Sequence, residues 1–212
     1  MQFATSECQY SFAVQILLEI SDEEINICEN IIEIRRLAMG FIQKIFLTAP
    51  NVILTVHYQG YPLKYIPWMV ELVPSVYIMV EHMEELIKHF NVERRIFAVY
   101  LIAHIVSSLS MPKHVHLAQM ILLVVENQMA LLEPHEKAIF FFNILPAFEI
   151  MSKKLEFVRP QIIGYIQKGI KIAHTRASVY PSMRLAMKQP ERIIIEAAKE
   201  TMQKIQEMQK LK

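Results

Sequence analysis

The spacing of apolar residues along the chain predicts helices, most clearly after Ser75. From there, apolar residues recur at steps of three and four, the spacing that places side chains on one face of a helix. These residues are Val76, Met79, Val80, Met83, Leu86, Ile87 and Phe90. The other side of this helix carries Glu81, His82, Glu84, Glu85, Lys88 and His89. We expect a surface helix with one buried face.

The next segment, about Glu93 to Ser110, differs because apolar residues surround the helix almost completely. Such a helix must be covered on most sides, by protein or by lipid. The stretch 96–112 has no formal charge and spans roughly 25 Å, against roughly 30 Å for the hydrocarbon core of a bilayer. It also contains His104 and three serines. These features favour a central helix of a helical array over a membrane helix.

Prolines divide this part of the chain into units of similar length. Pro112, Pro134 and Pro160 each open a new periodic stretch, and proline suits the first turn of a helix. Pro146 is expected to kink or end its helix. One helix and a turn in every 20–25 residues, roughly, gives helix pairs of the size found in HEAT and armadillo repeats. We therefore predict an all-α fold of antiparallel helix pairs in an α-solenoid.

Two helices are expected before this region, one near Phe12–Glu19 and a longer one from Asp22 to Leu47. Asp22 and the two glutamates after it would lie in the first turn of the longer helix, where acidic side chains complement the helix dipole. The segment from Pro50 to Pro74 contains two further prolines and a glycine, so we expect short pieces there.

The C-terminal pattern predicts a loop over Arg176–Gln189 and then an amphipathic helix from Pro190. The apolar stripe of that helix consists of Ile194, Ala198, Met202, Ile205 and Met208. We expect residues 1–180 to form a helical-repeat array. Residues 181–212 would form a loop and a C-terminal helix that packs on the array.

Composition supports a helical protein and narrows the function classes. The 212 residues are 53% hydrophobic and include only four glycines. This composition excludes disorder of the whole chain and disfavours glycine-dependent nucleotide-binding folds. Residues 1–39 carry seven acidic residues against two arginines, although the net charge is only +1. Proteins that bind nucleic acid directly usually have a clustered basic face, and the sequence shows none, so we expect no direct nucleic-acid site.

The sequence offers no constellation for catalysis. Gly164 and Gly169 have the spacing of a phosphate-binding loop, but Ile170 stands where the lysine should be, so a helix is expected. Cys28 lies among isoleucines, which predicts a small buried apolar residue rather than a nucleophile. No histidine, cysteine or carboxylate spacing indicates a metal site. We expect a protein that is not an enzyme and needs no cofactor or metal.

One run of residues carries a family resemblance. Val56-His57-Tyr58-Gln59-Gly60-Tyr61-Pro62, together with Pro74-Ser75, Arg95-Ile96-Phe97-Ala98 and Met111-Pro112-Lys113, resembles the C-terminal part of the Integrator complex subunit 2 family. The resemblance extends from about residue 12 to beyond residue 200 and is clearest over residues 46–125. Members of this family are several times longer than the present chain.

The resemblance implies a non-catalytic scaffold subunit in the nucleus that acts in transcription through protein–protein interaction. It implies a role in small nuclear RNA 3′-end processing and in regulating transcription by RNA polymerase II. The expected partners are other Integrator subunits and, indirectly, the polymerase and nascent RNA. Two alternatives remain: an all-helical ligand-binding domain with an apolar pocket, and a membrane-embedded protein. The second would associate with the nuclear membrane through residues 96–112.

The same run predicts a local structure and a candidate interface. Gly60 between two tyrosines, followed by Pro62, is typical of a tight turn that ends one helix and starts another. We call the candidate interface the aromatic turn, and it comprises Tyr58, Gln59, Tyr61, Tyr65 and Trp68. Aromatic residues are favoured anchors in protein interfaces. The alternative is that these rings fill the corner between two helices.

Overall fold

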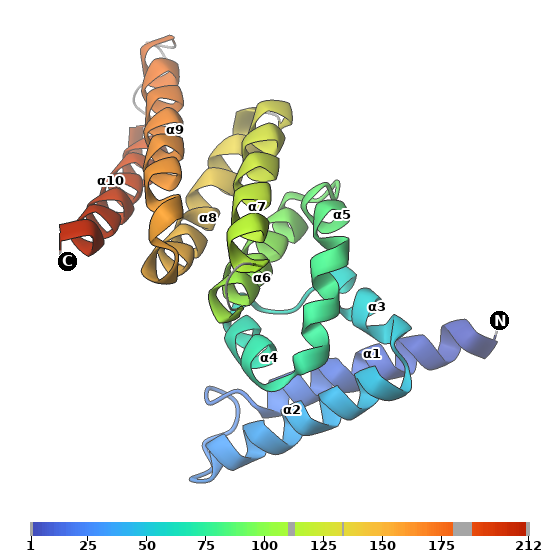
Figure 1. The fold of residues 1–212 in the computed structure, drawn as a ribbon. Helices are drawn as coiled ribbons and strands as arrows, with labels where there is room; N and C mark the ends of the chain where they lie inside the picture. The colour runs from blue at the N-terminus through green and yellow to red at the C-terminus, as the bar shows by residue number, and fades with distance from the viewer. Residues whose placement is uncertain (1, 110–112, 133, 180–187, 211–212) are drawn as a thin grey trace. The chain divides into compact units, whose positions relative to one another are not determined.

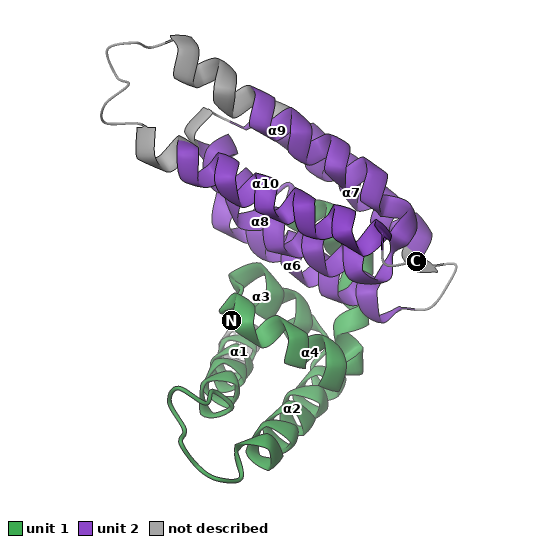
Figure 2. Ribbon diagram, turned by 90° about the vertical axis from the view of Figure 1, so that its left-hand side faces the viewer, with its two compact units in different colours: residues 1–86 green, residues 87–212 purple. Residues whose placement is uncertain are grey.

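The structure is a computed structural model that describes residues 2–109, 113–132, 134–179 and 188–210. Every regular element in these ranges is a helix (Figure 1), which confirms the predicted all-α class. The chain divides into two compact units, Met1–Leu86 and Ile87–Lys212 (Figure 2). The expected boundary at residue 181 falls within 180–187, outside the described residues, so the division at that point stays a prediction.

Unit 1 is built on two helices that pack along each other, with shorter pieces packed against them. Its elements are α1 (Gln2–Ile20), α2 (Ile31–Thr48), α3 (Asn51–Gln59), η1 (Leu63–Tyr65), α4 (Ile66–Leu72), η2 (Pro74–His82) and α5 (Met83–Ile87). The short pieces between Pro50 and Pro74 confirm the expected breaks. Leu18, Phe46 and Val56 are fully or almost fully buried and lie in three different helices of this core.

The connection between α1 and α2 corrects the predicted long helix. That helix begins at Ile31 rather than at Asp22, because residues 21–30 form turns. The backbone oxygen of Asp22 accepts from the amide of Asn26 at 2.8 Å, and its carboxylate accepts from the amide of Glu24 at 3.1 Å. Side chains that bond to nearby amides in this way compete with helix formation. The predicted burial of Cys28 is also wrong, since this cysteine is exposed in the connection.

The predicted surface helix after Ser75 is present, with two differences. It begins at Pro74 as the 3₁₀ helix η2 and becomes α-helical only at Met83. Val76 and Met79 on the predicted apolar face are fully buried. Phe90 lies beyond the end of α5 and is 84% exposed, so its predicted burial is wrong.

Unit 2 consists of long helices that pack against one another. They are α6 (Val92–Ser108), α7 (Lys113–Leu131), α8 (Pro134–Lys154), η3 (Glu156–Val158), α9 (Arg159–Val179) and α10 (Lys188–Lys210). The predicted central helix is α6, which is buried on most of its surface and packs against α7 and α8. Pro134 opens α8 and Pro160 lies in the first turn of α9, as expected. Helix α8 continues through Pro146, so the helix does not end there, and a kink at this residue stays a prediction.

The C-terminal helix α10 packs on α8 and α9 and is amphipathic as predicted. Ala198 and Ile205 of its apolar stripe are fully buried. The buried guanidinium of Arg159 joins the three helices, because it donates to the backbone oxygens of Ser152 at 2.8 Å and Met208 at 2.9 Å. The predicted loop over 176–189 is wrong at both ends, since α9 continues to Val179 and α10 begins at Lys188. Its middle part, residues 180–187, lies outside the described ranges.

Candidate functional site

The aromatic turn begins where Gly60 ends α3. Gly60 has φ 68° and ψ 167°, and its amide donates to the oxygen of Val56 at 2.9 Å. A positive φ is accessible to glycine at little cost because glycine has no Cβ. Pro62 follows, and its backbone oxygen accepts from the amide of Tyr65 at 3.0 Å to close η1. This geometry confirms the predicted tight turn between two helices.

Tyr61 points into unit 1, where it meets a buried histidine. His57 Nδ1–H donates to the oxygen of Ile53 at 2.7 Å, which leaves Nε2 to accept from the Tyr61 hydroxyl at 3.3 Å. The ring of Phe46 from α2 lies 6.1 Å from the imidazole. Burial lowers the pKa of His57 to about 4 and raises the pKa of Tyr61. Both side chains are therefore uncharged core groups at neutral pH.

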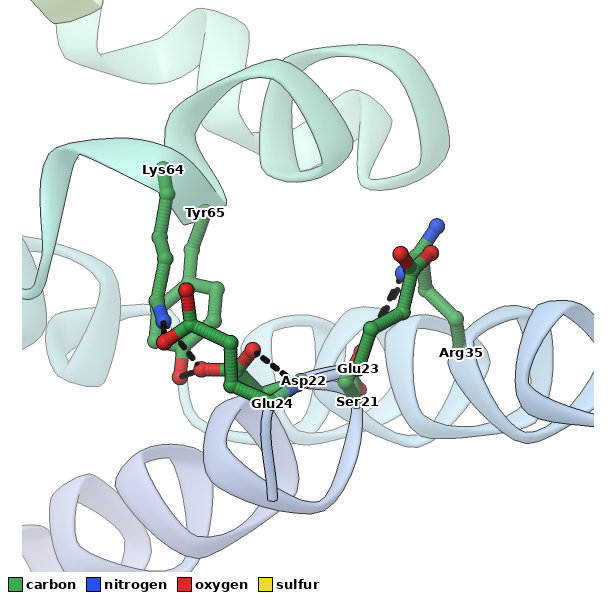
Figure 3. Close-up of polar contacts among 7 residues, drawn as sticks. All are labelled: Ser21, Asp22, Glu23, Glu24, Arg35, Lys64 and Tyr65. Atoms are coloured by element: carbon green, nitrogen blue, oxygen red, sulfur yellow. Dashed lines mark hydrogen bonds and ion pairs between the residues drawn. The ribbon is translucent and has the colours of Figure 1, made fainter. Parts of the chain in front are cut away.

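Tyr65 reaches the connection between α1 and α2, as Figure 3 shows. Its hydroxyl donates to Asp22 Oδ2 at 2.8 Å, and Lys64 Nζ lies 2.5 Å from the same oxygen and 2.9 Å from Glu24 Oε2. Hydrogen bonds from Lys64 and Tyr65 lower the pKa of Asp22 to about 2. Burial and the contact with Asp22 raise the pKa of Tyr65 to about 12. This cluster attaches η1 to a segment more than forty residues earlier in the chain.

Trp68 is held from the same side by an arginine of α2. The guanidinium carbon of Arg35 lies 3.6 Å from the centre of the Trp68 ring, a cation–π contact. Arg35 also donates to Glu23 Oε1 at 2.7 Å and to the backbone oxygen of Ser21 at 3.4 Å (Figure 3). One side chain thus joins α2, α4 and the connection that precedes α2.

The remaining two residues of the aromatic turn make contacts at its edge. The Tyr58 hydroxyl donates to Glu85 Oε2 at 2.5 Å, and burial together with this glutamate raises the pKa of Tyr58 to about 12. Gln59 Oε1 accepts from the Ser11 hydroxyl of α1 at 2.5 Å. Gln15 Nε2 donates to the oxygen of Gly60 at 3.4 Å. The turn is therefore attached to α1 and α5 as well.

Burial separates the five residues of the aromatic turn into two groups. Tyr61 and Tyr65 are buried, whereas Tyr58 and Trp68 are half-buried and Gln59 is exposed. The part of the predicted interface accessible to another molecule is therefore Tyr58, Gln59 and Trp68.

The cluster around Asp22 was not predicted from the sequence. The acidic residues at 22–24 were assigned to a helix dipole, and no local pattern links Asp22 to Lys64 or Arg35 to Trp68. The charged groups here are paired with one another, and the buried carboxylate of Asp22 is held by Lys64 and Tyr65, so the cluster builds a rigid corner rather than a reactive centre.

Other candidate chemistry gives no competing site. In the part of the chain that the structure describes, no three His, Cys, Asp or Glu residues are placed to hold a metal ion. Gly164 and Gly169 lie inside α9, which confirms the helical interpretation of that pair. A pocket of about 280 Å³ is lined by Gln119, Leu122, Leu123, Glu126, Gln161, Gly164, Tyr165 and Lys168. This mixed lining, without Met or Phe, does not favour the apolar ligand-binding alternative.

The membrane alternative depends on helix length and hydropathy. Among the described residues, no single helix is both long and apolar enough to span a membrane. Leu63–Leu72 and Pro74–Ile87 are together long and apolar enough to span a membrane, but the chain bends by 114° between them.

Fold and site together define an all-helical protein in which the polar cluster around Asp22 joins the aromatic turn to the connection between α1 and α2. Comparison with known proteins then gives the family. The model of the Integrator complex subunit 2 family matches residues 1–178, and the chain belongs to that family. The family that the Val56–Pro62 run resembles is thereby confirmed, although the match ends at residue 178 rather than beyond residue 200.

Individual relatives agree with the family match. Integrator complex subunit 2 of Drosophila melanogaster is 27% identical over 177 residues, which cover 81% of this chain and 16% of the relative. The Mus musculus and Homo sapiens subunits are 29% and 28% identical over 129 and 128 residues, covering 61% and 60% of this chain and 11% of each relative. The chain therefore spans less than a fifth of the length of these relatives.

Proposed function

We propose that this chain is a non-catalytic, scaffolding segment of the Integrator complex in the nucleus. In this role it supports small nuclear RNA 3′-end processing and the regulation of transcription by RNA polymerase II. The observation that carries the proposal is the family match over residues 1–178, which includes all of unit 1 and most of unit 2. Other Integrator subunits are its direct partners, and it reaches the polymerase and nascent RNA through them.

The proposed architecture for this role is a HEAT- or armadillo-like array of antiparallel helix pairs over residues 1–180. The packing in unit 2 supports it, because α6 contacts both α7 and α8 and α9 contacts both α8 and α10. In such arrays each helix pair packs on its neighbours and leaves an extended surface for partners. Residues 181–212 would pack on the array, and the contacts of α10 with α8 and α9 support that part.

The exposed part of the aromatic turn belongs to this proposal as a contact with a neighbouring subunit. Gln59 is its most accessible residue, and its side chain accepts a hydrogen bond from Ser11. Gln59→Ala should weaken the contact without unfolding unit 1. Tyr61→Ala should instead unfold unit 1, because it empties a buried site beside His57. Comparing the two variants separates a contact residue from a core residue.

The test of the proposed function is affinity purification of the tagged 212-residue chain from nuclei, followed by mass spectrometry. Co-purification of several Integrator subunits is the expected result. The matched control is Leu18→Asp, which places a charge at a fully buried position and should abolish recovery by unfolding unit 1. Absence of Integrator subunits from the wild-type sample would overturn the proposal.

A further inference from the structure

The connection between α1 and α2, together with the first turn of α2, exposes three isoleucines within eight residues. We call residues 25–32 the isoleucine loop. Ile25, Ile27 and Ile32 are 65%, 97% and 75% exposed, respectively. Single exposed apolar residues are common on protein surfaces and need no explanation. Three β-branched side chains displayed on the connection and the start of α2 form a concentrated apolar feature that folding of unit 1 does not use.

The isoleucine loop is held in a defined conformation by its own polar groups. Asn26 Nδ2 donates to the oxygen of Ile20 at 3.3 Å, and Asn26 Oδ1 accepts from the amide of Cys28 at 3.1 Å. The oxygen of Cys28 accepts from the amide of Ile31 at 3.1 Å, which leads directly into α2. A surface held in one conformation before binding loses less conformational entropy when a partner arrives.

The start of the loop is also attached to the rest of unit 1 through the aromatic turn. Asp22 is bound by Lys64 and Tyr65, and Glu23 by Arg35, so the two residues before Glu24 are fixed by η1 and α2 (Figure 3). Tyr65 of the aromatic turn thus helps to orient the surface that the isoleucines occupy.

The charge around the loop distinguishes between possible occupants. Glu23, Glu24, Glu29 and Glu33 are all exposed. Arg35, Lys64 and Arg36 pair with Glu23, Glu24 and Glu33, but residues 21–36 still carry five acidic side chains against two arginines, so the surface is net negative. A second copy of the chain bound through the same surface would place these glutamates against identical glutamates, and like charges facing each other oppose association. A partner with Lys or Arg around an apolar groove complements both the isoleucines and the glutamates.

We propose that the isoleucine loop inserts Ile25 and Ile27 into an apolar groove of a neighbouring protein subunit, and that Lys and Arg side chains border that groove. The inference rests on the proposed function, which makes the neighbour another Integrator subunit. Ile27 is the central anchor because nearly its whole side chain is available to a partner.

The test compares three tagged full-length chains purified from nuclei: wild type, an Ile25→Ser/Ile27→Ser double variant and Phe90→Ser. Phe90 is the matched control because it is 84% exposed and lies in unit 2. The double variant should recover at least tenfold less Integrator than wild type, with an unchanged melting temperature, and Phe90→Ser should recover as much as wild type. If the melting temperature of the double variant is lower than that of wild type, the Ile27→Ser single variant is tested instead, since this side chain contributes almost no packing within the chain.

The charge part of the proposal has its own arm. Glu29→Lys should reduce recovery, and raising the salt concentration during washing should weaken wild-type recovery more than Glu29→Lys recovery, because salt screens exposed charges. Equal recovery by Glu29→Lys and wild type at every salt concentration would overturn the basic border of the groove.

The outcomes separate this inference from the proposed function. If wild type recovers Integrator and the folded isoleucine variants recover it equally, the docking surface is wrong and the proposed function stands. If wild type recovers no Integrator subunits, the proposed function is wrong and the inference falls with it. Light scattering on the purified chains adds a third result: a wild-type dimer that the double variant converts to a monomer would identify a second copy as the occupant and overturn the inference.

Discussion

Acidification should destabilise unit 1 through His57. The imidazole is fully buried, its Nδ1–H donates to the oxygen of Ile53 at 2.7 Å, and Nε2 accepts from the Tyr61 hydroxyl at 3.3 Å. Protonation would place a positive charge in this core and a proton on Nε2, facing the proton that Tyr61 donates. The tyrosine hydroxyl can rotate to accept instead, but the charge stays buried. The folded state therefore resists protonation that the unfolded chain accepts.

The magnitude follows from the difference in pKa between the two states. Burial lowers the pKa of His57 from 6.5 to about 4. A depressed histidine pKa means that its contribution to stability is complete above pH 6.5 and is lost as the pH falls toward 4. Each pKa unit corresponds to about 1.4 kcal/mol, so the full loss is roughly 3 kcal/mol, and roughly 2 kcal/mol is already lost at pH 5. Asp22, whose pKa falls from 3.8 to about 2, loses its contribution only at lower pH.

The assay uses urea unfolding at pH 7 and pH 5, followed by fluorescence of Trp68. This residue is the only tryptophan of the chain and lies in unit 1, so its signal reports that unit. Wild type should lose roughly 2 kcal/mol between the two pH values. His57→Gln should lose less than about half of that, whatever its stability at pH 7. His104→Gln is the control for a histidine in unit 2, whose pKa burial also lowers. Equal losses in wild type and His57→Gln would refute the reasoning.

Three further substitutions test the helices. Gly40→Ala should raise the free energy of unfolding of unit 1 by about 1 kcal/mol in urea titrations, because a Cβ there meets open space inside α2; a loss of stability would contradict this. Gly169→Ala should destabilise unit 2, because its Cβ would overlap the ring of Phe141 and overpacking costs about 1–3 kcal/mol. Gly164→Ala in the same helix meets open space and should not destabilise, so equal effects in calorimetry would show that the overlap is harmless. Asn91→Ala should cost about 1 kcal/mol and speed amide exchange in the first turn of α6, because the Asn91 side chain accepts from two amides there; unchanged exchange would contradict the cap.

Features with a local physical cause were predicted correctly from the sequence. Helix α6 is apolar on nearly all sides, and only a covered helix can have that composition. The turn at Gly60 requires a positive φ, and the sequence Gly60-Tyr61-Pro62 predicted it. Pro134 and Pro160 lie at helix starts because a missing N–H costs nothing in the first turn.

The errors at residues 21–30 also involve contact between segments far apart in the sequence, in addition to the local bonds of Asp22. Asp22 was placed in the first turn of a helix because acidic residues suit that position. Its real partners, Lys64 and Tyr65, lie more than forty residues away, and no local pattern shows them. The same error reversed the expectation for Cys28: a helix would have buried it among isoleucines, whereas the turns at residues 21–30 leave it exposed.

Residue type alone does not distinguish the buried from the accessible residues of the candidate interface. Five residues within eleven positions qualified as interface anchors by chemistry. Only the three-dimensional course of the chain after Gly60 directs Tyr61 toward His57 and Tyr65 toward Asp22. A buried and an exposed tyrosine in such a turn are indistinguishable in sequence, because both rings are amphipathic.

The run that carries the family resemblance therefore acts first on folding. His57 and Tyr61 of this run, with Tyr65 shortly after it, hold α2, α3 and the connection after α1 together, so their loss would remove partner binding by unfolding unit 1. Loss of Integrator recovery in a Tyr61 variant would consequently say nothing about contact. Ile27 is the opposite case, since it is nearly free of the fold and its effect on recovery can only arise outside the chain. Substitutions on such an exposed surface can change partner binding without changing the stability of unit 1, so the two effects can be measured separately.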